Sequence, residues 1–135
     1  MEFLNVFALL EATQAFERKL NLALMYAGLR LPQFRAMDFL EKSGKITVSD
    51  LSRQLNVTRA TTSVLVNELM NMGVVENLAN RSDKRSFYIK LTDSGFKRLT
   101  MARKEVSLVE EKISGEFSEE EVVALNVFSK MIRKG

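Results

Sequence analysis

Residues 47–58 read Thr-Val-Ser-Asp-Leu-Ser-Arg-Gln-Leu-Asn-Val-Thr, and this stretch decides the fold. Thr47 is a good helix N-cap, and Asp50, three residues later, can reach back in a short version of the capping box. Two leucines four residues apart then follow on one helical face. The pattern breaks before Thr58, which is suited to cap a second helix. We therefore predict two helices joined by a tight turn.

The second helix continues the pattern for about four turns. Val64, Leu65, Leu69 and Met72 recur at helical spacing. Gly73 follows them and is placed to end the helix in the left-handed conformation. Two helices joined in this way, the second opening with small hydroxyl residues, form a helix-turn-helix.

The next segment predicts a β-hairpin. Val74–Glu76 is a candidate strand, residues 77–86 are polar, and Phe87–Leu91 is a β-branched and aromatic run that can return as its partner. Thr92 can cap the following helix, with Asp93 in its first turn. The fold class is therefore mainly α with a small β-hairpin wing (α+β), a winged helix-turn-helix.

Long amphipathic helices flank this unit on both sides. Leu4–Tyr26 forms one, Leu31-Pro32 starts a supporting helix that ends at Gly44, and a third runs from Phe96 to about Ser114. A capping box at residues 118–121 opens the last. Their apolar faces exceed what one winged helix can cover. We expect residues 30–95 to be the DNA-binding domain, and residues 1–29 and 96–135 to be a helical dimerisation region; the alternative is that the terminal helices fold back on their own domain.

Composition narrows the function classes. The 135 residues are 46% hydrophobic and 27% charged and contain neither cysteine nor histidine. The usual catalytic bases, thiol nucleophiles and soft metal ligands are thus missing, and we expect no enzyme, cofactor or metal site. No run is long enough to span a bilayer and no targeting segment is recognisable, so we expect a cytoplasmic protein without a membrane partner. Residues 45–90 carry seven basic and four acidic residues, an excess equal to the net charge of +3.

Several segments in order resemble one family. Gly73-Val74-Val75-Glu76 is followed by Asp83-Lys84-Arg85 and then by Leu91-Thr92-Asp93-Ser94-Gly95. Leu31-Pro32-Gln33-Phe34 and Leu51–Val57 fit the same pattern. With these segments at this spacing, the chain resembles the MarR (multiple-antibiotic-resistance regulator) family of winged-helix transcription factors over nearly its whole length.

The resemblance implies a homodimer that binds a pseudo-palindromic double-stranded DNA operator. It also implies a pocket for a small aromatic or phenolic effector whose binding releases a repressor from DNA. In the family pattern Arg85 enters the minor groove, where a guanidinium is favoured. Asp83 would hold that arginine or the hairpin in place. Five apolar residues lie near the expected pocket, although each is better explained as core: Phe7, Phe16, Tyr26, Met37 and Phe39.

The second helix of the motif supplies the remaining candidate contacts. Thr58, Arg59, Thr61, Thr62, Ser63 and Asn67 are expected to reach bases or phosphates, although Thr58 is equally well explained as a cap alone. Arg81 and Lys84 are candidate phosphate contacts. The chain departs from the family at Val64, Glu68 and Asn77, where members often carry basic residues. Because the second helix carries so few basic residues, an alternative stays open: a winged-helix module that binds protein, or antagonises another regulator, with weak or no DNA binding.

Overall fold

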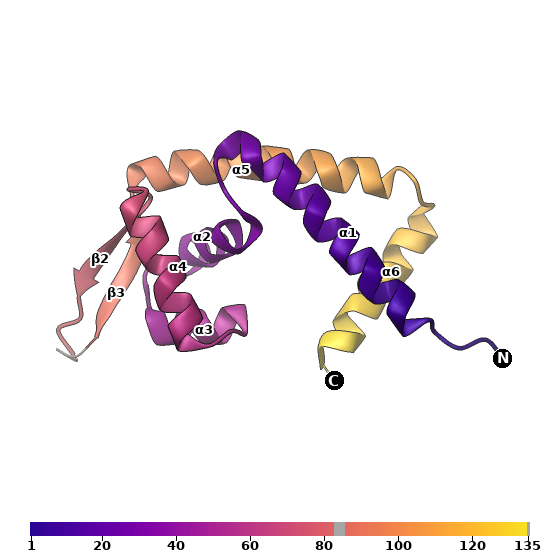
Figure 1. The fold of residues 1–135 in the computed structure, drawn as a ribbon, viewed down its shortest axis with the longest axis horizontal. Coiled ribbons are helices and arrows are strands. Elements are labelled where there is room, and N and C mark those ends of the chain that lie inside the picture. Colours follow the sequence, from indigo (N-terminus) through magenta and orange to yellow (C-terminus); the bar gives the residue numbers. More distant parts are fainter. Residues whose placement is uncertain (83–85, 135) are drawn as a thin grey trace.

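The computed structural model describes residues 1–82 and 86–134, and over these residues the chain is mostly helical with one small sheet (Figure 1). The helices are α1 (Val6–Leu24), the 3-10 turn η1 (Met25–Ala27), α2 (Leu31–Ser43), α3 (Val48–Leu55), α4 (Arg59–Asn71), α5 (Asp93–Ser114) and α6 (Glu119–Lys134). The strands are β1 (Ile46–Thr47), β2 (Val75–Ala79) and β3 (Phe87–Leu91). Helices α2–α4 and the sheet form one end of the molecule, α5 runs along its top, and the amino-terminal part of α1 and α6 lie at the other end.

Three helices begin at the threonines that the sequence identifies as caps. Thr47, Thr58 and Thr92 each accept a hydrogen bond from the backbone N–H three residues later, at 3.0–3.1 Å. The reciprocal bond expected from Asp50 is absent from the described contacts, because its carboxylate pairs with Arg53 instead. The helix starts are therefore confirmed, and the capping box at the first of them is wrong.

The last helix has the complete capping box. The Ser118 hydroxyl accepts from the Glu121 backbone N–H at 3.2 Å, and the Glu121 carboxylate accepts from the Ser118 N–H at 2.8 Å. Gly73 ends α4 with φ +75°, in the left-handed region that glycine adopts without strain. These local signals place α4 and α6 as the sequence predicts.

The sheet has three antiparallel strands in the order β1-β3-β2. In the hairpin Val75 pairs with Leu91 and Ala79 with Phe87. Strand β2 thus begins one residue later and ends three residues later than the predicted Val74–Glu76. Strand β1, which the sequence analysis did not identify, pairs Ile46 with Ile89 and attaches the hairpin to the start of α3.

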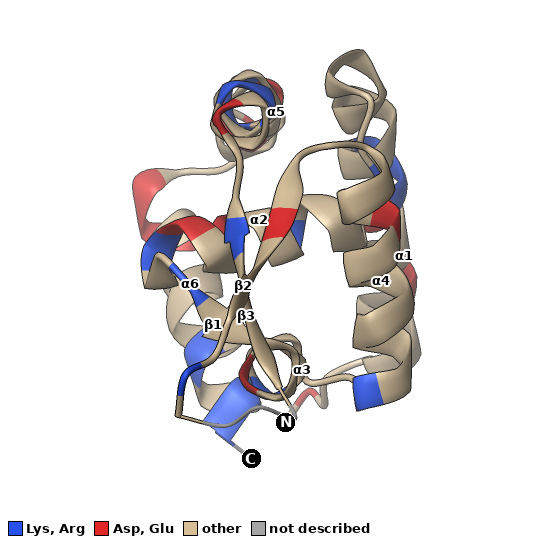
Figure 2. Ribbon diagram, turned by 90° about the vertical axis from the view of Figure 1, so that its left-hand side faces the viewer, with Lys and Arg blue, Asp and Glu red and all other residues tan. Residues whose placement is uncertain are grey.

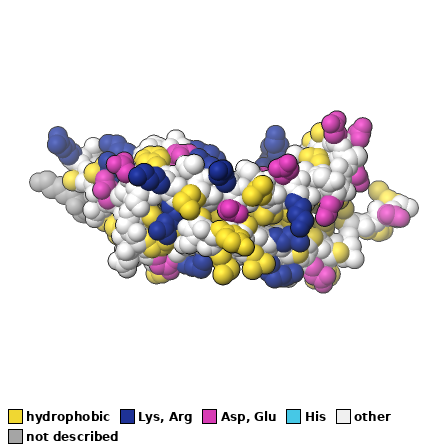
Figure 3. Space-filling model, turned by 90° about the horizontal axis from the view of Figure 1, so that it is seen from above, with side chains coloured by type: hydrophobic (Ala, Val, Ile, Leu, Met, Phe, Trp, Pro, Cys, Tyr) yellow, Lys and Arg dark blue, Asp and Glu magenta, His cyan; other side chains and the backbone are white. Residues whose placement is uncertain are grey.

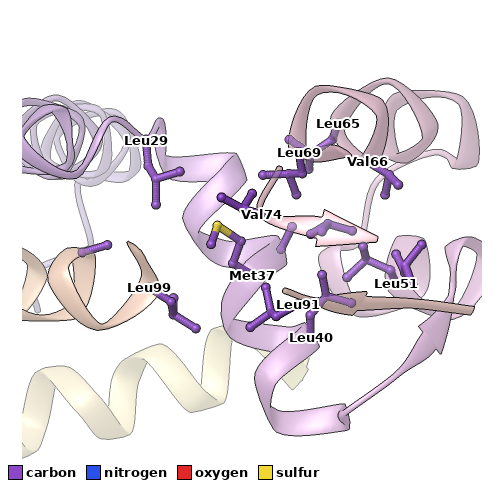
Figure 4. Close-up of a cluster of buried hydrophobic side chains, with 14 of the residues drawn as sticks. Leu29, Met37, Leu40, Leu51, Leu65, Val66, Leu69, Val74, Leu91 and Leu99 are labelled. Carbon is purple, nitrogen blue, oxygen red and sulfur yellow. The ribbon is translucent and has the colours of Figure 1, made fainter. Parts of the chain in front are cut away.

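A single hydrophobic core joins the helix-turn-helix, the sheet and α5 (Figure 4). Met37 and Leu40 from α2, Leu51 from α3 and Leu69 from α4 are completely buried together with Leu99 from α5. Because α5 contributes to this core, the helix-turn-helix, the sheet and the first half of α5 form one body.

An ion-pair cluster also ties α5 to α2. Arg103 contacts Asp38 at 2.6 Å and also pairs with Glu41, while Lys42 contacts Asp38 at 2.9 Å. Burial raises the pKa of Asp38, but the hydrogen bonds from Arg103 and Lys42 outweigh that effect, so the pKa lies below its usual value of 3.8. The carboxylate is therefore charged at neutral pH and holds the two helices together.

The far end of the molecule is different, because its helices bury little. Leu24 is the buried residue of α1, and α6 has no buried residue in the described chain. Phe7 on α1 is 78% exposed, and Ile132 on α6 is 61% exposed. No other part of the described chain covers these exposed apolar side chains. None of the described helices is both long and apolar enough to cross a membrane.

Candidate nucleic-acid interface

The turn between α3 and α4 sets the position of the second helix. Asn56 adopts the left-handed conformation, with φ 57°, which an asparagine tolerates better than most residues. The Val57 N–H then donates to the Ser52 carbonyl at 3.2 Å, and Thr58 starts α4. This compact turn leaves the amino end of α4 exposed at the lower edge of the molecule in Figure 1.

The predicted contact residues on α4 differ in how far their side chains are exposed. Arg59, Thr61 and Asn67 are exposed, and Ser63 is partly exposed. The Thr58 hydroxyl accepts from the Thr61 N–H and lies 2.9 Å from the Thr61 hydroxyl, so Thr58 acts as a cap. The outer face of α4 therefore offers one basic side chain, Arg59, and several small polar groups.

Thr62 corrects the sequence analysis. Its side chain is completely buried, and its hydroxyl donates to the Thr58 carbonyl at 3.0 Å. A threonine hydroxyl that is hydrogen-bonded to its own helix can be buried in a core, so a polar residue type did not guarantee an exposed side chain here. Thr62 has no surface with which to contact a ligand.

Glu68 turns away from the outer face of α4. Its carboxylate lies 2.5 Å from the Arg30 guanidinium and accepts a hydrogen bond from the Gln33 amide at 3.0 Å. The Gln33 side chain also accepts from the Arg30 N–H at 2.9 Å, which closes the start of α2. Glu68 thus links α4 to α2, and its charge is largely compensated by Arg30.

The hairpin projects from the body beside α4 rather than folding back on it (Figure 1). At its outer end the Asn80 amide donates to the Ser86 hydroxyl at 3.0 Å, and the Asn80 side-chain oxygen accepts from the Ser82 N–H at 3.0 Å. Asn80 therefore shapes the turn, a role that the sequence analysis missed. An asparagine at the start of a polar turn was the available signal, because its side chain commonly bonds to the backbone two residues later.

The four predicted wing residues differ in what can be said of them. Arg81 is exposed, in the turn that follows β2. Asp83, Lys84 and Arg85 lie outside the described residues, so their predicted roles remain predictions.

Two further basic residues lie beside side chains of the hairpin strands. The Lys45 ammonium lies 4.8 Å from the centre of the Tyr88 ring, and Lys90 lies 3.3 Å from Glu76 across the strands. Figure 2 shows basic positions along the hairpin and at the lower end of α4. Positive charge thus accompanies both protruding elements.

A cleft of about 310 Å³ lies between α1, α2 and the helix-turn-helix. Its lining combines Glu17 and Asn21 of α1 and Arg35 of α2 with Thr61 and Leu65 of α4.

None of the five apolar residues considered for a pocket lines this cleft. Met37 is completely buried and Phe39 packs against the core, as expected of core residues. The core explanation is wrong for three of them, because Phe7, Phe16 and Tyr26 are exposed in the single chain.

Comparison with known proteins assigns this architecture. The family model described as the MarR family matches residues 27–86, which contain α2 to the outer end of the hairpin. This stretch of the chain is therefore similar to the MarR family. The chain is 28% identical over 83 residues to the HTH-type transcriptional regulator BilQ of Clostridioides difficile (strain CD3), covering 62% of this chain and 56% of the relative. It is also 28% identical over 89 residues to the regulator FarR of Neisseria gonorrhoeae, covering 66% and 61%.

The chain spans less than two thirds of the length of these curated relatives. Solved structures match it over almost its whole length. A mutant MarR from E. coli in complex with operator DNA superposes with a TM-score of 0.87 at 24% identity, covering 93% of this chain and 90% of that one. The S. aureus MepR–DNA complex gives a TM-score of 0.86 at 22% identity, covering 99% and 100%. The two curated relatives are described as transcriptional regulators, and the solved structures show that this chain shares their fold.

Proposed function

We propose that this chain binds double-stranded DNA sequence-specifically, as a homodimer on a pseudo-palindromic operator, and regulates transcription in the cytoplasm as a ligand-responsive repressor. One observation carries the proposal: the amino end of α4 and the outer ends of strands β2 and β3 lie at the same edge of the winged helix, on the side away from α5 (Figure 1). A helix and a hairpin presented together suit a major groove and an adjacent minor groove. The relatives named above are regulators, and two similar structures hold DNA.

The exposed polar groups at this edge would divide the work. Ser63 and Asn67 face outward from α4 and are suited to base edges, while Thr61 and Arg59 at its first turn are suited to phosphates. Arg81 and Lys84 would contact the backbone, with Arg85 in the minor groove and Asp83 supporting it. Because Glu68 is paired with Arg30, it presents little repulsion to the duplex.

Dimerisation is supported by the uncovered helices at the far end. Side chains on α1 and α6 are apolar and exposed, and Figure 3 shows hydrophobic side chains exposed on the upper face. Burying one large apolar side chain contributes roughly 1.5–3 kcal/mol, so several such residues on two helices favour a second copy. Residues 1–29 and 96–135 would form this dimerisation region and residues 30–95 the reading domain, with the first half of α5 packed into the core of that domain. A two-fold pair can place two recognition helices about 34 Å apart, one turn of DNA.

Ligand response is supported by the cleft that includes α4. Its volume of about 310 Å³ lies at the lower end of the range for small-molecule sites. A molecule bound there would contact Thr61 and Leu65 on the recognition helix and Asn21 on α1 at once. The effector class that we propose is a small aromatic or phenolic compound.

Binding to the DNA that flanks the gene tests the central proposal. Fluorescence anisotropy should show sequence-selective binding that weakens with salt. Arg59→Ala should make the log–log slope shallower by about 1.8, because each protomer of the dimer loses one phosphate contact worth about 0.9. Lys104→Ala, at an exposed position on α5, is the matched control and should leave the slope unchanged. Sedimentation equilibrium should show a dimer at micromolar concentration. A monomer, or binding that is indifferent to salt and to sequence, would contradict the proposal.

A second candidate function is a protein-binding module, and the single basic residue on α4 favours it. Such a module would bind a partner regulator with little dependence on salt and would not select DNA sequences. The same titrations therefore separate the two functions.

A further inference from the structure

We propose that the outer face of α4 reads neighbouring A·T base pairs, with Val64 packed on a thymine methyl group and Asn67 bonded to an adenine. This inference rests on the proposed DNA binding and adds to it the class of base pair that the helix selects. It assigns specificity to a residue, Val64, that offers no hydrogen bond.

The two side chains share one exposed face of α4. Val64 is 60% exposed, and Asn67 is exposed three residues later, whereas Leu65 and Val66 between them are buried. Three residues of helix place them about 60° apart around the axis and about 4.5 Å apart along it. That spacing is close to the roughly 3.4 Å between successive base pairs, so both can face adjacent pairs.

The chemistry of each side chain matches one base. The thymine methyl is the apolar group that a base pair presents in the major groove, and a valine desolvates it without leaving a polar group unpaired. The Asn67 amide both donates and accepts, which matches N7 and the N6 amino group of adenine. No hydrogen bond within the described part of the chain occupies the Asn67 amide, so both of its functions are available.

The same face lacks the groups that read G·C pairs. Guanine is read by arginine or lysine donors, and α4 carries Arg59 alone. Arg59 lies five residues before Val64, which turns it about 140° away around the helix, toward the flank where phosphates would lie. Cytosine is read by a carboxylate, but that of Glu68 is held by Arg30 and Gln33. What remains on the outer face is suited to adenine and thymine.

Base analogues test the inference directly. Duplexes selected from a random pool by the full chain should be enriched in A·T at two adjacent positions of each half-site. Replacing the contacted thymine by deoxyuridine removes only its methyl group. We expect affinity to fall about fourfold for each half-site, as for one methyl group left in water. In Val64→Ala this thymine-to-uracil ratio should approach one, and in Asn67→Ala the preference for adenine over guanine should be lost.

The control is Val123→Ala, because Val123 is similarly exposed, at 61%, but lies on α6. Its thymine-to-uracil ratio should equal that of the wild type, whatever happens to overall affinity. Circular dichroism should show that Val64→Ala and Asn67→Ala are folded, since each removes an exposed side chain.

The possible failures are distinguishable. Wild-type binding that is indifferent to uracil, a uracil penalty that persists in Val64→Ala, or a selected core of G·C pairs would each overturn this inference while salt-sensitive, sequence-selective binding left the proposed function standing. Absence of any duplex binding would overturn both. Partner-protein binding through Val64 without DNA binding would have the same consequence.

Discussion

Replacing Gly95 by alanine places a methyl group against the backbone carbonyl of Val74. An ideal Cβ built on Gly95 would lie 2.1 Å from the Val74 oxygen, 3.1 Å from the Val74 carbonyl carbon and 3.3 Å from Leu91 Cδ2. The carbonyl cannot turn aside, because it accepts the Thr92 N–H at 3.0 Å and Val74 is completely buried. The first turn of α5 must therefore move away from the end of the hairpin.

The size of that movement sets the expected loss of stability. Ordinary contact begins at 3.4 Å, so the gap must open by about 1.3 Å. Overpacking of a filled site costs about 1–3 kcal/mol, and a weakened Thr92 hydrogen bond adds about 1 kcal/mol. Alanine regains about 0.5–1 kcal/mol over glycine in a helix. We expect the free energy of unfolding to fall by about 1–3.5 kcal/mol and the melting temperature by about 3–17 °C.

Thermal and urea unfolding of Gly95→Ala, at a matched protomer concentration, measure this loss. Gly115→Ala is the matched control, because a Cβ there would meet the Glu111 carbonyl oxygen at 3.4 Å, an ordinary contact. The control should melt within a few degrees of the wild type or above it. If the two variants were equally stable, the close approach of α5 to Val74 would not exist in solution.

Three further predictions concern other contacts. Arg103→Gln should lower the free energy of unfolding at pH 5–7. Because folding lowers the pKa of Asp38, the stabilisation is fully present above the unfolded value of 3.8 and is lost as the pH falls through the lowered folded-state pKa. Urea titrations of the wild type and the variant should therefore converge as the pH falls below 3.8. Ser118→Ala should cost about 1 kcal/mol, whereas Ser129→Ala, within α6, should cost little; equal melting points by circular dichroism would rule out the cap. Asn80→Ala should weaken DNA binding in anisotropy with little change in melting temperature. Unchanged affinity would show that the hydrogen bonds of Asn80 do not support DNA binding by the hairpin.

The elements that sequence could predict are those fixed by near neighbours. Thr47, Thr58 and Thr92 each cap a helix through a backbone N–H only three residues away. Gly73 ends α4 through its own backbone conformation. Such signals are complete within one turn of helix, so reading them requires no knowledge of the tertiary fold.

The features that sequence missed depend on distant partners. Strand β1 has only two residues, too few for a strand pattern, and exists because Ile46 meets Ile89 far along the chain. Glu68 looks like a charge on the reading face until the fold brings it against Arg30. Thr62 looks like a polar contact until packing buries it. In each case the residue type was known and its neighbours were not.

The 22 residues of α5 make it a stiff beam about 33 Å long. Its first half is fixed in the winged-helix core through Leu99 and to α2 through Arg103, so that end of the molecule must travel with it. A tilt of about 10° at one end of such a beam displaces the other by about 6 Å, nearly two steps of the base-pair ladder. A small change of angle among the terminal helices would therefore displace the winged helix far enough to lose its register on DNA, without any local distortion of α4.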